Sequence, residues 1–149
     1  MDVVKIQAEA LKELLMYNNR VRWFEKDEVM YLIMTDGVAL YAIPKEKFFL
    51  NLKKDQCTSV NTVLQYFNSN PEKYEMALTD ELKNIEKPKC TAIKFEGKNF
   101  NIWFNEKRLK KFGKLTDLKV VATKQLAPVG VYTKAGEFLG LLTPLNVKD

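Results

Sequence analysis

The sequence predicts an α+β fold with mostly antiparallel sheets, and three observations support this prediction. Segments rich in β-branched and aromatic residues are separated by turn-forming residues. Apolar residues recur at helical spacing over residues 8–17 and 106–112. Both ends of the chain also show the same order of elements, namely strand, helix, strand, strand, strand. The length of 149 residues favours one domain, 1–149.

The first unit covers residues 3–43. Residues 3–6 are short and β-branched, which predicts a strand. The helix over 8–17 is expected to follow, with an apolar stripe formed by Ala8, Leu11, Leu14 and Leu15. Further strands are expected at residues 21–24, 29–34 and 38–43, the middle one covered on both faces because it is continuously apolar. Thr35-Asp36-Gly37 suits a tight hairpin turn, and Pro44 ends the last strand.

Residues 45–89 form an irregular insertion. A helix over residues 60–67, capped by Thr58 or Ser59, ends at the segment Asn68-Ser69-Asn70-Pro71. A strand is expected at 74–78, followed over residues 80–89 by a helical turn or a linker.

Residues 91–145 hold a hairpin and the second unit. The hairpin consists of strands 91–96 and 100–104, with Phe100, Ile102 and Phe104 on one face. Asn105 is a good N-cap for the helix 106–112, and Gly113 is a good stop. Strands at 118–123, 129–133 and 138–142 complete the unit. Two such units would place both repeat helices on one face of antiparallel sheets.

Composition argues against catalysis. The chain has no histidine, so the commonest general base and the commonest metal ligand are missing. The glycine spacing forms no phosphate-binding loop, and the two cysteines, Cys57 and Cys90, are not a Cys-x-x-Cys pair. We therefore expect a protein that is not an enzyme and that uses no cofactor and no metal.

Hydropathy and cysteine content predict whether the protein binds a membrane and in which compartment it is found. The longest apolar run, residues 29–34, is too short to span a bilayer, so no membrane partner is expected. The N-terminus lacks the pattern of a signal peptide. Two cysteines are too few for a disulfide framework, which favours reduced thiols and a cytoplasmic location.

The net charge is +5, and much of it falls in one segment. Between residues 106 and 114 a single acid, Glu106, accompanies five cations: Lys107, Arg108, Lys110, Lys111 and Lys114. On a helical wheel the four lysines lie opposite Leu109 and Phe112, with Arg108 at the flank. Lysine suits phosphate contacts as a point charge, so this face is a candidate nucleic-acid surface. The alternative is a solvated helix face.

Other residues allow two interpretations. Lysines also form a second basic scatter, expected on loops and strand edges, whose alternative role is solubility and protection of strand edges: Lys83, Lys87, Lys89, Lys94 and Lys98. Trp103 would either stack on a nucleic-acid base or pack under a helix or at a subunit contact.

The order of elements resembles one domain of a DNA sliding clamp, such as the β subunit of bacterial DNA polymerase III. Three local features carry this resemblance: the hairpin Met34-Thr35-Asp36-Gly37, the helix start Phe104-Asn105-Glu106-Lys107-Arg108-Leu109, and the end Leu142-Thr143-Pro144-Leu145. The resemblance covers both ends of the chain, and residues 45–89 have no counterpart.

The resemblance implies non-specific contact with duplex DNA, since clamp helices line the inner wall of a ring. The resemblance implies that the DNA-facing residues are Lys107, Lys110, Lys111 and Lys114, together with Lys12 and Arg20 from the first helix. Bacterial clamps also dock peptides near their C-terminal tail, where Leu142, Pro144 and Leu145 fall. Thr143 and Asn146 replace the family's Met and Arg, and the alternative is a strand end packed on the core.

One such domain cannot encircle DNA, so a ring would require several copies. The expected partners are duplex DNA, a second copy of the chain or a replication protein, and a phage or mobile element is a suggested origin. The alternative function is a protein–protein interaction or oligomeric accessory module that does not bind nucleic acid.

Overall fold

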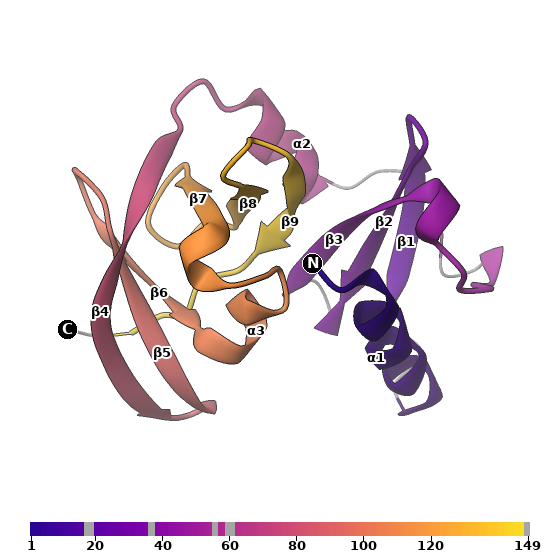
Figure 1. Cartoon of the computed structure of the whole chain (residues 1–149), viewed down its shortest axis with the longest axis horizontal. Helices are drawn as coiled ribbons and strands as arrows, with labels where there is room; N and C mark the ends of the chain where they lie inside the picture. Colours follow the sequence, from indigo (N-terminus) through magenta and orange to yellow (C-terminus); the bar gives the residue numbers. More distant parts are fainter. Residues whose placement is uncertain (17–19, 36–37, 55–56, 59–61, 148–149) are drawn as a thin grey trace.

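The computed structural model describes residues 1–16, 20–35, 38–54, 57–58 and 62–147 (Figure 1). Its helices are α1 Val3–Met16, α2 Thr62–Ser69 and α3 Glu106–Lys110. Its strands are β1 Arg22–Lys26, β2 Val29–Met34, β3 Ala39–Pro44, β4 Tyr74–Glu86, β5 Lys89–Glu96, β6 Asn101–Asn105, β7 Leu118–Ala122, β8 Val129–Thr133 and β9 Phe138–Leu142. Short 3₁₀ helices occur at Lys45–Lys47 and Leu115–Asp117.

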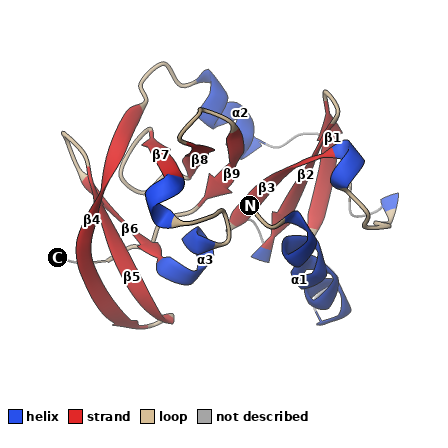
Figure 2. Ribbon diagram, viewed as in Figure 1, coloured by secondary structure: helices blue, strands red, loops and turns tan. Residues whose placement is uncertain are grey.

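The described strands form one nine-stranded sheet in the order β1-β2-β3-β9-β8-β7-β4-β5-β6, and all neighbours run antiparallel. The predicted α+β class with antiparallel strands is therefore confirmed (Figure 2). Pairing of β3 with β9 joins the N-terminal strands to the C-terminal hairpin, with Leu40 opposite Leu141.

The helices cover both faces of the sheet. Alternation along the strands sends Tyr41 of β3 into the main core, whereas its neighbour Leu40 enters a smaller cluster on the other face. The main core receives Ile6 and Ala10 from α1 and Leu109 from α3. The smaller cluster receives Leu64 and Phe67 from α2. Helices α1 and α3 thus share one face, and α2 lies on the opposite face.

The predicted strand at residues 3–6 was wrong, because these residues begin α1. The Asp2 carboxylate accepts a hydrogen bond from the Lys5 N–H at 3.0 Å, which satisfies a free donor of the first helical turn. Burial of Ile6 then outweighs the β-propensity of the segment. The N-terminal unit is accordingly α-β-β-β, whereas β6-α3-β7-β8-β9 has the expected order.

The predicted apolar stripe of the first helix was also largely wrong. The buried residues of α1 are Ile6, Gln7 and Ala10, and Leu14 packs at the edge of the core. Leu11 and Leu15 are exposed instead. The helix contains two apolar stripes, and periodicity alone does not tell which one faces the sheet.

The segment 80–89 was wrongly predicted as a helical turn or a linker. Strand β4 continues to Glu86 and pairs with β5 from Leu82, opposite Ile93, after an irregularity in register that follows Leu78. Its far half is polar because both faces are exposed. The strand is maintained by backbone pairing with β5, which the residues of β4 alone do not reveal.

The C-terminal predictions agree closely with the structure. Both hairpins, β5–β6 and β8–β9, form as expected. In the N-terminal part, β2 alternates between buried and half-buried residues, so its second face is only partly covered, contrary to expectation. The predictions for Tyr17, the Asp36-Gly37 turn and the Ser59 cap concern residues outside the described ranges.

Candidate nucleic-acid interface

The lysine-rich segment is held in place by a cap and two buried anchors. The Asn105 side chain accepts a hydrogen bond from the Arg108 N–H at 3.3 Å, as its N-cap position predicts. Leu109 and Phe112 are fully buried. Helix α3 is short, so this cap and these anchors determine its direction and leave its cations on the outer side.

The four lysines predicted to lie together line one pocket of about 540 Å³ between α3 and the start of α1. Lys5 joins them from α1, which raises the number of lysines around the pocket to five. The same pocket is also lined by Asp2 and Glu9. Two of the four predicted lysines, Lys107 and Lys110, lie in α3, and Lys111 and Lys114 follow its end.

Two ion pairs neutralise part of this positive charge. Lys111 Nζ lies 2.7 Å from Glu9 Oε2, and Lys110 Nζ lies 2.9 Å from Glu106 Oε1. Glu9 Oε2 accepts no well-oriented hydrogen bond, so its contact with Lys111 is chiefly electrostatic. Lys107 and Lys114 are exposed and have no ion-pair partner among the described residues.

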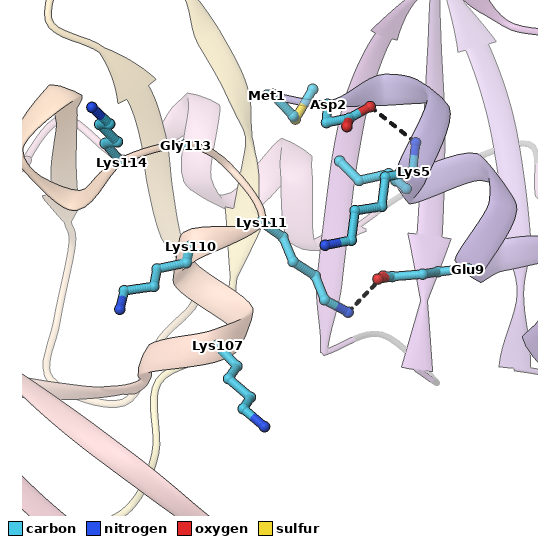
Figure 3. A pocket seen from close by; sticks show the side chains of 10 residues that line it. Met1, Asp2, Lys5, Glu9, Lys107, Lys110, Lys111, Gly113 and Lys114 are labelled. Atoms are coloured by element: carbon cyan, nitrogen blue, oxygen red, sulfur yellow. Dashed lines mark hydrogen bonds and ion pairs between the residues drawn. The ribbon is translucent and has the colours of Figure 1, made fainter.

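The side chains of the lysines fan out rather than converge (Figure 3). Lys111 reaches across to Glu9 on α1, and Lys5 extends into the space between the two helices. Lys110 and Lys114 point away from α1. This arrangement does not form a cage for one small anion and instead spreads positive charge over an extended surface, as a polyanionic backbone requires.

A second pocket of about 800 Å³ continues this surface from α3 to β4 and β5. It shares Lys107 and Lys111 with the first pocket and adds Arg108 and Lys89. We refer to the lysines and the arginine around both pockets as the basic surface: Lys5, Lys89, Lys107, Arg108, Lys110, Lys111 and Lys114.

Sequence reasoning did not place Lys5 or Lys89 at this surface. From the sequence, Lys89 was grouped with the second scatter of lysines. In the structure Lys89 begins β5 and lines a pocket together with residues of α3. Lys5 lay in a segment predicted to be a strand. The spacing of Lys5 and Glu9 by one helical turn could have indicated a shared helix face.

The structure does not bring Lys12 or Arg20 to the basic surface. Both are exposed, but neither lines the two pockets. Lys12 lies farther along α1, and Arg20 precedes β1.

Tyr41 lies beneath the junction of α1 and α3. Its ring packs against Phe112 with a centroid separation of 4.9 Å. Burial raises the pKa of Tyr41 far above its usual range, and the nearby Glu9 carboxylate adds to this rise. The Arg108 guanidinium acts on the pKa in the opposite direction. Tyr41 therefore stays neutral and supports the basic surface from below.

Two of the three residues suggested for peptide docking are buried, and Leu145 is half-buried and lines a small pocket of about 110 Å³. Leu142 belongs to the main core, and Pro144 is buried. The Leu145 N–H donates to the carbonyl oxygen of Trp103 at 2.8 Å, which joins the C-terminal segment to β6. Trp103 is itself buried, so its ring is not an open stacking platform.

No family model matches the chain, and no curated protein or solved structure is significantly similar to it. The resemblance to sliding clamps therefore stays a prediction from the sequence.

The described residues contain no candidate metal centre, since no three or more of their His, Cys, Asp or Glu side chains are grouped closely enough to hold an ion. Cys57 and Cys90 are free thiols. Of the helices whose residues the structure describes, none is long and apolar enough to cross a membrane.

Proposed function

We propose that this protein is a non-catalytic DNA-associated protein that contacts the nucleic-acid backbone through the basic surface. The observation that supports this proposal most strongly is the pocket between α1 and α3, which is lined by Lys5 of α1, by Lys107 and Lys110 of α3, and by Lys111 and Lys114 just after α3. Phosphate oxygens would replace water around Lys107 and Lys114 first, because these side chains have no competing ion pair among the described residues.

Non-specific contact is the form of binding that this surface favours. It contains six lysines and only one arginine, Arg108, and arginine is the residue that most often reads guanine edges. Lysines spread over α1, α3 and β5 would follow a charged backbone without reading sequence.

The clamp-like arrangement is part of this proposal. The order β6-α3-β7-β8-β9 and the shared face of α1 and α3 support it, whereas the helical conformation of residues 3–6, which were expected to form a strand, weakens it. In this proposal the protein is a cytoplasmic replication accessory factor, with a phage or mobile element as its source, and any ring would be built from several copies.

Two exposed lysines provide the sharpest test. Lys107→Glu combined with Lys114→Glu removes two phosphate contacts without breaking an ion pair shown by the structure. In a fluorescence-anisotropy titration with duplex DNA, the affinity at low salt should fall at least about tenfold. The slope of log K against log salt should become shallower by roughly 0.9 per lost contact.

The matched control is Lys26→Glu combined with Lys98→Glu, which changes the net charge equally at exposed positions outside both pockets. It should bind more tightly than the test variant and keep the wild-type slope. Equal loss in both variants, or no binding of wild-type protein to duplex or single-stranded DNA at low salt, would refute the proposal. Light scattering that shows a strict monomer would exclude a ring.

A further inference from the structure

The outer side of α1 exposes an apolar stripe made of Val4, Ala8, Leu11 and Leu15. Val4 is 62% exposed, Leu11 51% and Leu15 81%, although each lies in a regular helix packed on the sheet. Single exposed apolar residues are common, but an aligned row of them marks an interaction surface. This stripe lies outside the pocket that carries the proposed function.

The spacing of the stripe fits packing against another helix. Its members are separated by four, three and four residues, which is the spacing of the apolar seam in helix pairs. Ala8, in the middle, is small enough to let a second helix approach closely. At 1.5 Å per residue the stripe is about 16 Å long, which corresponds to three turns of a partner helix.

Phe49 is a further exposed apolar residue whose backbone is bonded to α1. Its N–H donates to Gln7 Oε1 at 2.8 Å, so the chain after β3 is fixed against α1. The Phe49 side chain is 57% exposed. An aromatic residue at the edge of an apolar helix face can act as an anchor for a bound helix.

The charges around the stripe indicate the character of the partner. Both acids of α1 have partners on other elements: Glu9 pairs with Lys111, and Glu13 accepts a hydrogen bond from the Thr35 N–H. The charged side chains of α1 that are exposed are Lys5 and Lys12. In the nearby 3₁₀ helix exposed Glu46 and Lys47 cancel each other, and Lys45 pairs with Glu25. The exposed Asp2 carboxylate precedes α1 and accepts a hydrogen bond from its first turn. The exposed rim on α1 is therefore positive.

We infer that the α1 stripe docks an amphipathic helix of another protein, with apolar residues at seam spacing and acidic residues beside them. A second copy fits less well, because pairing two α1 stripes would bring Lys5 and Lys12 close to the same lysines. An anionic membrane fits less well because such binding usually requires about four to eight clustered cations, and of the cations of the basic surface only Lys5 lies on α1.

The inference is tested with a synthetic helical peptide of about 18 residues, with Leu at the seam positions and Glu elsewhere. The full chain should bind it with micromolar affinity in a fluorescence-anisotropy titration. Leu11→Ser combined with Leu15→Ser should weaken binding at least tenfold, and Lys12→Glu should weaken it severalfold. Both changes are at exposed positions, and melting temperatures check that the fold is retained.

Control variants and control peptides show whether the α1 stripe itself holds the peptide. Leu82→Ser removes an equally exposed leucine on β4 and should leave peptide binding unchanged. A scrambled peptide and a peptide with Lys in place of Glu should bind at least tenfold more weakly. Lys107→Glu with Lys114→Glu should not affect peptide binding, so that failure of the DNA proposal and failure of this inference are distinguishable.

Four outcomes would overturn the inference: no peptide binding, equal binding of the scrambled peptide, dimerisation that the leucine substitutions abolish, or binding to anionic phosphatidylserine vesicles that the same substitutions abolish.

Discussion

Gln7 illustrates how single polar residues fix this structure. It is fully buried, and its amide NH₂ donates to the carbonyl oxygens of Val3 and Lys47, each at 3.0 Å. Its Oε1 accepts from the Phe49 N–H. Since a buried amide without partners is costly, these bonds make α1 and the chain after β3 depend on each other. The hydrogen bond from the Phe49 backbone to α1 follows from this residue.

The buried Tyr41 hydroxyl should make the stability of the protein depend on pH. Burial and Glu9 raise its pKa in the folded protein. Above pH 10 the unfolded chain loses this proton while the folded chain keeps it, so the free energy of unfolding falls as pH rises. The contribution of Tyr41 is up to about 1.4 kcal/mol per pH unit. Tyr41→Phe should flatten the fall between about pH 10 and 11.5.

Urea titrations at several pH values measure this effect. Lysines also deprotonate in this range, so the comparison is between wild type and the Tyr41→Phe variant at each pH. Parallel curves for the two proteins would show that the Tyr41 hydroxyl ionises equally in the folded and unfolded states.

At the scale of elements, the β3–β9 pair joins the two parts of the sheet. Gly140 of β9 lies opposite Tyr41 of β3 and has φ of +155°, which favours glycine. A Cβ at this position would overlap the carbonyl oxygen of Leu40, and Phe112 would lie 2.9 Å away. The strands therefore meet closely only because this residue has no side chain.

Gly140→Ala should consequently destabilise the protein strongly, by about 3 kcal/mol or more, because backbone atoms would have to shift. Gly136 is the matched control, since it also has a positive φ, +94°, but a Cβ added there would meet no heavy atom within 4 Å. Gly136→Ala should cost only about 1–2 kcal/mol of backbone strain. Chemical denaturation measures both, and equal losses would contradict the close approach of the strands as the cause.

At the scale of the whole molecule, the Glu9–Lys111 ion pair links α1 to the end of α3. Helix α1 lies over β1–β3 and α3 contacts β5 and β6, so the pair connects elements from distant parts of the sheet (Figure 1). Because both side chains remain partly exposed, the pair contributes little to stability. Its larger effect is to place a carboxylate within the basic surface.

Glu9→Gln should therefore strengthen binding to duplex DNA at low salt by severalfold, because it removes an anion and leaves Lys111 available to a phosphate. The salt dependence should become steeper by up to about 0.9, the contribution of one phosphate contact. The free energy of unfolding should fall by less than about 1 kcal/mol. Weaker DNA binding by a stably folded variant would indicate that the pair positions the surface instead of competing with phosphate.

Elements that depend on neighbouring residues could be predicted from the sequence, whereas elements that depend on residues far apart in the chain could not. Asn105 as a cap and the hairpin β8–β9 could be predicted because their determinants lie within a few residues. The far half of β4 could not, because its polar residues become a strand only when β5 pairs with them. Likewise, α1 has two apolar stripes, and the sheet that selects one of them is assembled from distant strands.

The sequence by itself determined the α+β class, the start and the apolar side of α3, and the excess positive charge of the segment 106–114, since these depend on local spacing and composition. Only the tertiary structure decided which lysines from elsewhere join that segment and which leucines of α1 stay exposed. The physical reason is that both outcomes depend on the pairing of β3 with β9 and on α1 and α3 sharing one core. These are contacts between residues far apart in the chain, which local patterns do not encode.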